Sequence, residues 1–130
     1  MAKIEPYAAG SEFDPPGYAQ GIKVTGAQTI LFLAGQVAYD KNGNCAHPGD
    51  FKAQAHAVLR ALKAQVEAGG GTLRDIVKIN TYVTDLRHRP AYAEVRAEFF
   101  GGKLPASTMV GVTALAHPDF LIEVEAIAVL

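Results

Sequence analysis

Apolar and polar residues follow one another with two different periods along the chain, which predicts both strands and helices. Residues 29–37 form a nearly unbroken run of branched and aromatic side chains, typical of a buried strand. Residues 76–83 alternate instead, so we expect a strand whose more apolar side carries Val77 and Ile79, with Ile76 on the opposite side. Further strands are predicted at residues 22–24, 107–112 and 121–129, and the first of these is expected to form a hairpin with residues 29–37.

Two segments carry apolar residues at helical spacing. The first begins after Asp50, whose carboxylate suits a helix N-cap because it accepts otherwise unpaired amide hydrogens. It ends at the run Gly69-Gly70-Gly71, which resembles a helix end and not a phosphate-binding loop. Residues 91–100 form the second predicted helix, and glycines follow it directly. The apolar positions of the first helix are Phe51, Ala55, Val58, Leu59, Leu62 and Val66.

The order of these elements predicts an α+β domain that spans residues 1–130, with two helices on one face of a mixed sheet. Residues 1–20, which contain three prolines, are expected to form an extended arm. Apolar residues remain for the second sheet face, and an isolated chain should not expose a large apolar patch. We therefore expect an oligomer that covers this face. The residues concerned are Val77, Ile79, Val110 and Val112.

Composition excludes several classes of protein. A net charge of −1, with scattered Lys and Arg, argues against nucleic-acid binding. The single cysteine, Cys45, cannot form an internal disulfide and fits a reducing compartment. The chain begins without an apolar leader segment, and its longest apolar run is too short to cross a bilayer. We therefore expect a cytoplasmic protein without a membrane partner.

Few polar residues interrupt the apolar strands, and these are the candidates for chemistry. Gly35 precedes Gln36, and a glycine within a strand often marks a bulge or a close backbone approach. Glu123 is flanked by apolar residues, and a partly buried carboxylate of raised pKa suits acid–base catalysis. Glu123 and Glu125 could equally form a solvated strand face. The four histidines lack the spacing of metal ligands, so we expect no metal site, and no dinucleotide-binding motif occurs.

Several short motifs along nearly the whole chain together resemble the RidA/YjgF/endoribonuclease L-PSP (Rid) family. Singly each motif is weak, but their order and spacing make the set specific. The motifs are PGYAQG at residues 16–21, AGQV at 34–37 with Asp40, the first helix over 54–67 with Gly69-Gly70, DIVK at 75–78, YVTDL at 82–86, Phe99-Phe100, LPA at 104–106 and IEVEAIA at 122–128.

The resemblance implies a chorismate-mutase-like fold and a homotrimer whose sheets form a central barrel. It also implies that enamines and imines are hydrolysed to keto acids and ammonia in clefts between protomers, without a cofactor. Glu123 would activate the attacking water, Tyr18 would assist catalysis, and backbone amides near Met109 would bind a substrate oxygen. The residues assigned by position are Tyr18, Gly35, Gln36, Ser107, Thr108, Met109 and Glu123.

The chain departs from the family pattern at the position that follows Pro105-Ala106. Active deaminases of the family usually carry an arginine there that binds the substrate carboxylate, whereas this chain has Ser107. A charge-assisted contact of about 1.5–3 kcal/mol would be missing. Ala93 and Arg96 stand where the family commonly has Asn and Tyr. Arg96 is therefore a candidate substrate-binding residue, although a surface role is the alternative.

These observations predict an enamine or imine deaminase whose cleft is retuned away from simple 2-imino acids. The alternative is a non-catalytic trimer that binds a metabolite or a protein partner in the same cleft. A ribonuclease activity follows only from an old family label, and the absence of a basic, aromatic-rich surface argues against it.

Overall fold

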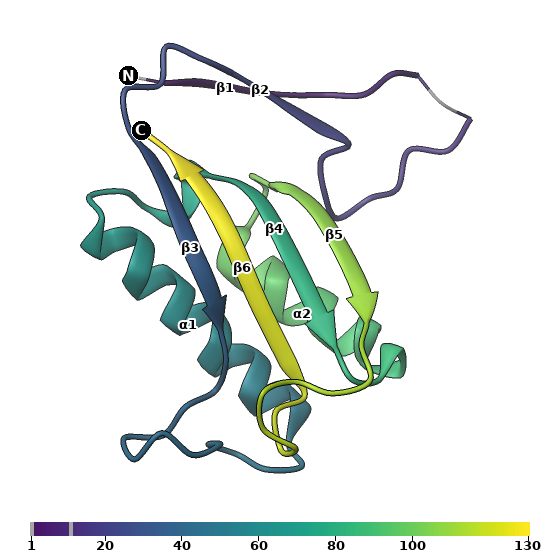
Figure 1. The fold of residues 1–130 in the computed structure, drawn as a ribbon. Helices are drawn as coiled ribbons and strands as arrows, with labels where there is room; N and C mark the ends of the chain where they lie inside the picture. Colours follow the sequence, from purple (N-terminus) through teal and green to yellow (C-terminus); the bar gives the residue numbers. More distant parts are fainter. Residues whose placement is uncertain (1, 11) are drawn as a thin grey trace.

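The computed structural model describes residues 2–10 and 12–130, which form a sheet with two helices on one face and a separate two-stranded hairpin (Figure 1). This arrangement confirms the predicted α+β fold with a mixed sheet. The elements in chain order are β1 Lys3–Tyr7, β2 Gly21–Thr25, β3 Ile30–Gln36, α1 Phe51–Ala68, the 3-10 helix η1 Leu73–Asp75, β4 Ile76–Val83, the 3-10 helix η2 Leu86–His88, α2 Arg89–Phe100, β5 Ala106–Gly111 and β6 Ile122–Val129.

The main sheet has the strand order β3-β6-β4-β5. Strand β6 pairs antiparallel with β3 and β4, whereas β4 and β5 run parallel. The predicted hairpin between β2 and β3 is wrong, because β2 pairs with β1 and extends the chain away from the sheet. Strand β3 instead pairs with the C-terminal strand, which offers it an apolar partner from Ile30↔Val129 to Leu33↔Ala126. The N-terminal arm thus contains a strand that sequence analysis did not predict.

The alternation of strand β4 is interrupted near its start. Its pairing with β6 shifts register between Ile76 and Lys78. The irregularity places Ile76 on the same buried side as Ile79, so the prediction that these residues face opposite sides is wrong. Ile79 packs in the core beneath the helices and does not belong to the second sheet face. The strand residues of this core are Ile76, Ile79, Val83, Ile122, Val124, Ala126 and Ala128.

The second face of the sheet remains partly apolar and uncovered. Phe32 is 77% exposed, Ile30 is 55% exposed and Val110 is 42% exposed. Val110 was predicted on this face. Ile30 and Phe32 belong to β3, and the prediction that this segment is a buried strand is wrong for the single chain, because β3 lies at the edge of the sheet and one of its sides is exposed. Polar residues of β4 and β6 share the face with them, because Asn80 pairs with Glu125 and Tyr82 pairs with Glu123.

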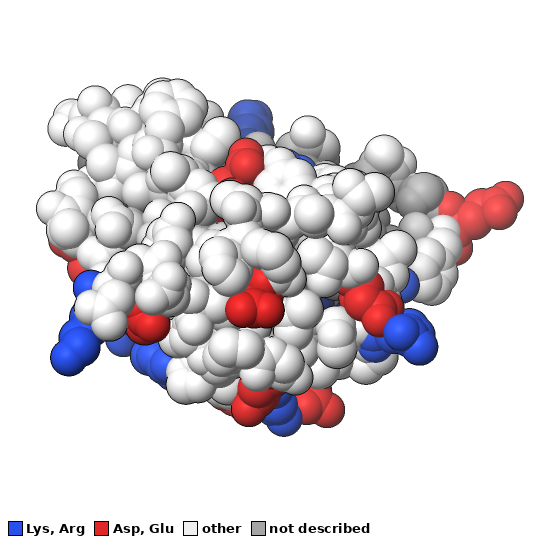
Figure 2. All heavy atoms as spheres, turned by 60° about the horizontal axis from the view of Figure 1, so that its bottom comes forward, with Lys and Arg blue, Asp and Glu red and all other residues white. Residues whose placement is uncertain are grey.

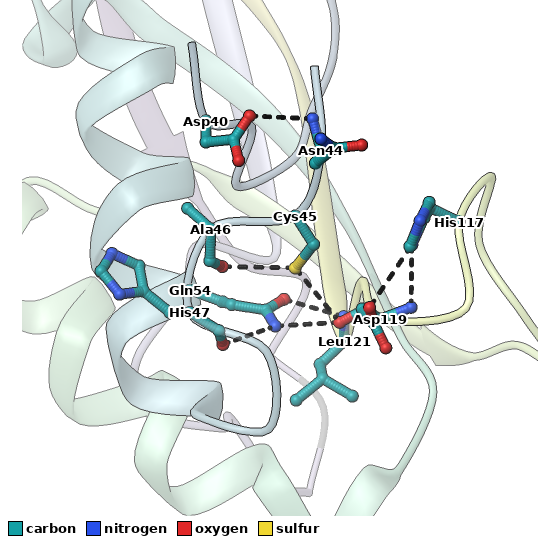
Figure 3. A network of polar contacts seen from close by, with 9 residues as sticks. All are labelled: Asp40, Asn44, Cys45, Ala46, His47, Gln54, His117, Asp119 and Leu121. Atoms are coloured by element: carbon teal, nitrogen blue, oxygen red, sulfur yellow. Dashed lines mark hydrogen bonds and ion pairs between the residues drawn. The ribbon is translucent and has the colours of Figure 1, made fainter. Parts of the chain in front are cut away.

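Helix α1 is held at its start by a buried amide side chain (Figure 3). Asp50 caps the helix by accepting a hydrogen bond from the Ala53 amide, as predicted. Gln54 is fully buried and donates to the carbonyl oxygens of His47 and Asp119, at 3.1 and 3.0 Å, while its own oxygen accepts from the Leu121 amide. One side chain thereby joins α1 to the loop before it and to the segment that leads into β6.

Candidate active site

A cavity of about 740 Å³ lies between helix α2, strand β5 and the segment around Tyr18. Five predicted site residues line it, so the structure brings together residues separated by most of the chain. The predicted residues are Tyr18, Arg96, Ser107, Thr108 and Met109, and the others that line it are Pro16, Leu86, Arg89, Tyr92 and Ala93.

The Tyr18 segment is attached to the beginning of strand β5. The Ala19 amide donates to the Pro105 carbonyl oxygen at 3.1 Å, and Ala19 forms a parallel bridge with Ala106. Next to it, Gly17 has a φ of +94°, which favours glycine. A Cβ at Gly17 would also lie only 2.7 Å from an Arg96 guanidinium nitrogen. The glycine therefore allows the arginine to pack directly against the backbone.

Arg96 and Tyr92 form one side of the cavity on helix α2. The Arg96 guanidinium carbon lies 5.5 Å from the centre of the Tyr92 ring, a cation–π contact. The Tyr92 hydroxyl and the Thr81 hydroxyl form a buried hydrogen bond of 2.9 Å between α2 and β4. Burial raises the pKa of Tyr92, so its phenol stays protonated and keeps this bond. The ring beneath Arg96 is therefore fixed in place.

Gly35 and Glu123 meet on the other side of the sheet. The pairing of β3 with β6 shifts between Leu33 and Gln36, and a Cβ at Gly35 would collide with the Glu123 carboxylate. Both features expected of a glycine in a strand, a bulge and a close approach, are thus present. The Gln36 side chain folds back onto its own strand, since its amide nitrogen donates to the Ala34 carbonyl oxygen at 3.0 Å.

Glu123 and Glu125 occupy the same face but have different surroundings. Glu125 accepts a hydrogen bond of 3.3 Å from the Asn80 amide, and its hydrogen bond with Tyr82 raises the pKa of that phenol. Within residues 2–10 and 12–130, the Glu123 side chain forms no hydrogen bond or ion pair. Its carboxylate is therefore open to a ligand, whereas that of Glu125 has protein partners.

The predicted site residues form two groups that do not meet within one chain. Gly35, Gln36 and Glu123 do not line the cavity beside Ser107. Strand β4 lies between β5 and β6, and neighbouring strands are about 4.8 Å apart. Ser107 pairs with the buried Ile79 and so faces the helix side, whereas Glu123 lies on the open side. The two groups could act together only across a contact between protomers.

Sequence analysis did not predict Arg89 as part of the cavity. Arg89 and Arg96 are seven residues apart, which is two helical turns and places them on the same side of α2. This spacing was visible in the sequence. The second helix was predicted to begin only at residue 91, so Arg89 fell before its expected start.

The described residues offer no other catalytic centre of a familiar kind. Groups of His, Cys, Asp and Glu able to hold a metal are absent from residues 2–10 and 12–130. Cys45 is buried and its thiol donates to the carbonyl oxygens of Ala46 and Asp119 (Figure 3). Burial and the nearby Asp119 and Asp40 carboxylates raise the pKa of Cys45, which opposes a role as a nucleophile.

Two surface features bear on possible partners. On the face drawn in Figure 2, basic and acidic side chains are interspersed in a largely uncharged surface, and Lys and Arg form no continuous patch. No helix in the described part of the chain is long and apolar enough to cross a membrane.

Comparison with known proteins agrees with the fold and the motifs. The family model for endoribonuclease L-PSP matches residues 13–130. The RutC family protein PH0854 of Pyrococcus horikoshii is 41% identical over 111 residues, which are 85% of each chain. The structure of the Rid family protein YyfB from Yersinia pestis superposes with a TM-score of 0.87 at 31% identity and covers 98% of each chain. RidA from an Antarctic Psychrobacter gives 0.73 at 32% identity, covering 96% of this chain and 93% of its own. The chain therefore belongs to the Rid/YjgF family.

Proposed function

We propose that this protein hydrolyses a small enamine or imine to a carbonyl compound and ammonia, in clefts between the protomers of a homotrimer. The family includes enamine and imine deaminases. The observation that carries the proposal is the Glu123 carboxylate, which lies against the Gly35 backbone and has no protein partner of its own in the described chain. A carboxylate free of partners can accept a proton from a water molecule.

The assembly is proposed because one protomer holds only half of the site. The cavity beside β5 supplies Tyr18, Arg96 and Ser107, while the open sheet face supplies Gly35 and Glu123. The open face also exposes Phe32 and Ile30, which need cover in solution. Packing the β5 edge of one protomer against the open face of the next would satisfy both needs.

Hydrolysis in such a cleft needs one water and no cofactor. An enamine first takes a proton from solvent on its carbon and becomes an iminium ion, the same species that an imine gives when its nitrogen is protonated. Glu123 then removes a proton from water as the oxygen attacks the imine carbon, which gives a carbinolamine. A proton passes to the nitrogen, the carbon–nitrogen bond breaks, and ammonia leaves as the carbonyl group forms. Backbone amides near Met109 and the Tyr18 hydroxyl would orient the substrate.

Ser107 argues against a simple 2-imino acid as the preferred substrate. A hydroxyl cannot provide the charge-assisted, bidentate contact that an arginine gives to a carboxylate. Losing that contact weakens affinity by roughly one to two powers of ten. We therefore propose that the cleft accepts an imine or enamine bound in another way.

Release of keto acid from imines that an amino-acid oxidase generates in place would test the activity. We expect Glu123→Gln to abolish any acceleration of that release, because an amide cannot accept the proton from water. Glu125→Gln is the matched control, since it lies on the same face of β6 but its carboxylate already has the partners Asn80 and Tyr82. We expect this control to keep most of the activity.

Three outcomes would contradict parts of the proposal. Equal turnover in Glu123→Gln and in the unmodified protein would exclude Glu123 as the water-activating group. Strong acceleration with 2-iminobutyrate would contradict a retuned cleft. No acceleration with any imine, but saturable binding of a metabolite, would favour a non-catalytic trimer.

A further inference from the structure

We propose that Arg96 and Arg89 form an anion-binding wall of the cavity, and that the ligand of this wall is a small dicarboxylate. The inference rests on the proposed function, because it names the class of substrate for the same cleft: the imine or enamine of a dicarboxylic acid. The two arginines would take over the task that the family gives to an arginine at the position of Ser107.

The charge of the cavity is the first support. Its walls contain two guanidinium groups and no Asp or Glu among the residues described. Neither Arg89 nor Arg96 forms an ion pair within residues 2–10 and 12–130, whereas the neighbouring Arg87 is paired with Asp85 at 2.7 Å. A cavity with unpaired positive charge in a chain of net charge −1 is suited to a negatively charged ligand.

The fixed position of Arg96 is the second support. Its guanidinium packs against the Gly17 backbone on one side and lies over the Tyr92 ring on another. The Tyr92 ring is anchored in turn by its buried hydrogen bond to Thr81. Binding an anion would therefore cost little side-chain entropy at Arg96, in contrast to a freely rotating surface arginine.

The start of helix α2 adds positive potential at the same place. The cavity is lined by Leu86, Arg89, Tyr92 and Ala93, which surround the first turn of the helix. His88 gives this turn no side-chain cap, and the turn contains no acidic residue. The Arg89 amide already donates to the Leu86 carbonyl oxygen and Pro90 has no amide hydrogen, so this helix start favours an anion through the positive end of its dipole and not through free amides.

Two arginines at different depths favour a ligand with two negative groups. Arg96 is half-buried and Arg89 is exposed, and their Cα atoms are about 10.5 Å apart along the helix axis. One carboxylate at Arg96 and another at Arg89 would span this wall. The cavity volume of about 740 Å³ has room for a chain of four or five carbons.

Isothermal titration calorimetry on the full protein at low salt would test the inference without any turnover. The probes are 2-oxoglutarate, as the keto form of a dicarboxylate, 2-oxobutyrate, as a monocarboxylate of similar shape, and inorganic phosphate. We expect 2-oxoglutarate to bind at least about tenfold more tightly than 2-oxobutyrate, because it gains a second charge-assisted contact.

Substitutions assign the contacts. We expect Arg96→Gln to weaken 2-oxoglutarate binding by about tenfold to a hundredfold. Arg96→Lys should recover part of the loss, because it keeps the charge but not the bidentate geometry. Arg89→Gln should remove the preference for the dicarboxylate over the monocarboxylate. Arg60→Gln, on the exposed side of α1, is the control for the loss of one positive charge and should leave binding unchanged.

The possible results separate this inference from the proposed function. Unchanged 2-oxoglutarate binding in both Arg96→Gln and Arg89→Gln would overturn the inference, even if the protein proved to be a deaminase. Equal affinity for phosphate and 2-oxoglutarate would overturn the dicarboxylate class. Arginine-dependent 2-oxoglutarate binding in a protein that hydrolyses no imine would support the anion site and refute the deaminase.

Discussion

Gly35 is the residue at which the open sheet face has no room for a side chain. If the proposed deaminase activity is present, we expect Gly35→Ala to reduce its turnover by roughly a hundredfold, because the added methyl group would displace the Glu123 carboxylate by an ångström or more. Thermal unfolding should still show a folded protein. Gly102→Ala is the control, since no heavy atom lies within 4 Å of a Cβ added there. Full turnover in Gly35→Ala would show that the contact has no part in catalysis.

The positions and contacts of single residues could be predicted from the sequence to different degrees. Gly35 could be singled out because a glycine in an apolar strand has few explanations, and the bulge and the close approach are both present. The burial of Gln54 could not be foreseen, because its three backbone partners come from loops whose positions depend on the whole fold. Arg96 was a candidate through its departure from the family pattern, and it does line the cavity.

At the scale of elements, Gln54 connects helix α1 to two loops. We expect Gln54→Leu to lower the free energy of unfolding by about 2 kcal/mol, because it leaves the carbonyl groups of His47 and Asp119 and the amide of Leu121 without their partner. Urea denaturation would measure the change. Gln65→Leu, an exposed position on the same helix, should change stability by less than about 0.5 kcal/mol. A similar small effect of Gln54→Leu would mean that the network contributes little to stability.

Helices were predicted more accurately than strand partners, for a physical reason. The signals for α1, its Asp50 cap and its terminal glycines, are local, and the helix spans Phe51–Ala68 as expected. Strand pairing depends on distant segments, so the proximity of β2 and β3 in sequence was misleading. The register shift in β4 was also hidden, because an extra residue in a strand leaves no composition signal.

For the whole molecule, the open sheet face is the expected contact between protomers. We expect light scattering to give a mass of three chains for the unmodified protein at micromolar concentration. Phe32→Asp should shift the protein to smaller species, because it places a charge on an apolar side chain that is 77% exposed in one protomer. The fold of the isolated chain should persist, as judged by circular dichroism. A single-chain mass for the unmodified protein would refute the trimer and, with it, a cleft between protomers.

The order of elements in the sequence was enough to predict two helices over a mixed sheet. It was not enough to predict that the site residues are divided between the two faces of that sheet. Position in the sequence could not show that Ser107 and Glu123 lie on opposite faces of the sheet, because that depends on strand order and on which face the helices cover. The family resemblance supplied the list of residues. The structure supplies their separation within a protomer.

In the part of the chain that the structure describes, β4 is the strand neighbour of β5 along its full length, and the other side of β5 has none. Residues that line the cavity from this edge and from α2, such as Ala93, Arg96 and Ser107, lie outside the hydrophobic core. Substitutions at these positions therefore carry little risk of unfolding the chain. The ligand specificity of such a scaffold can therefore be changed by single substitutions at the cavity wall while the fold is kept.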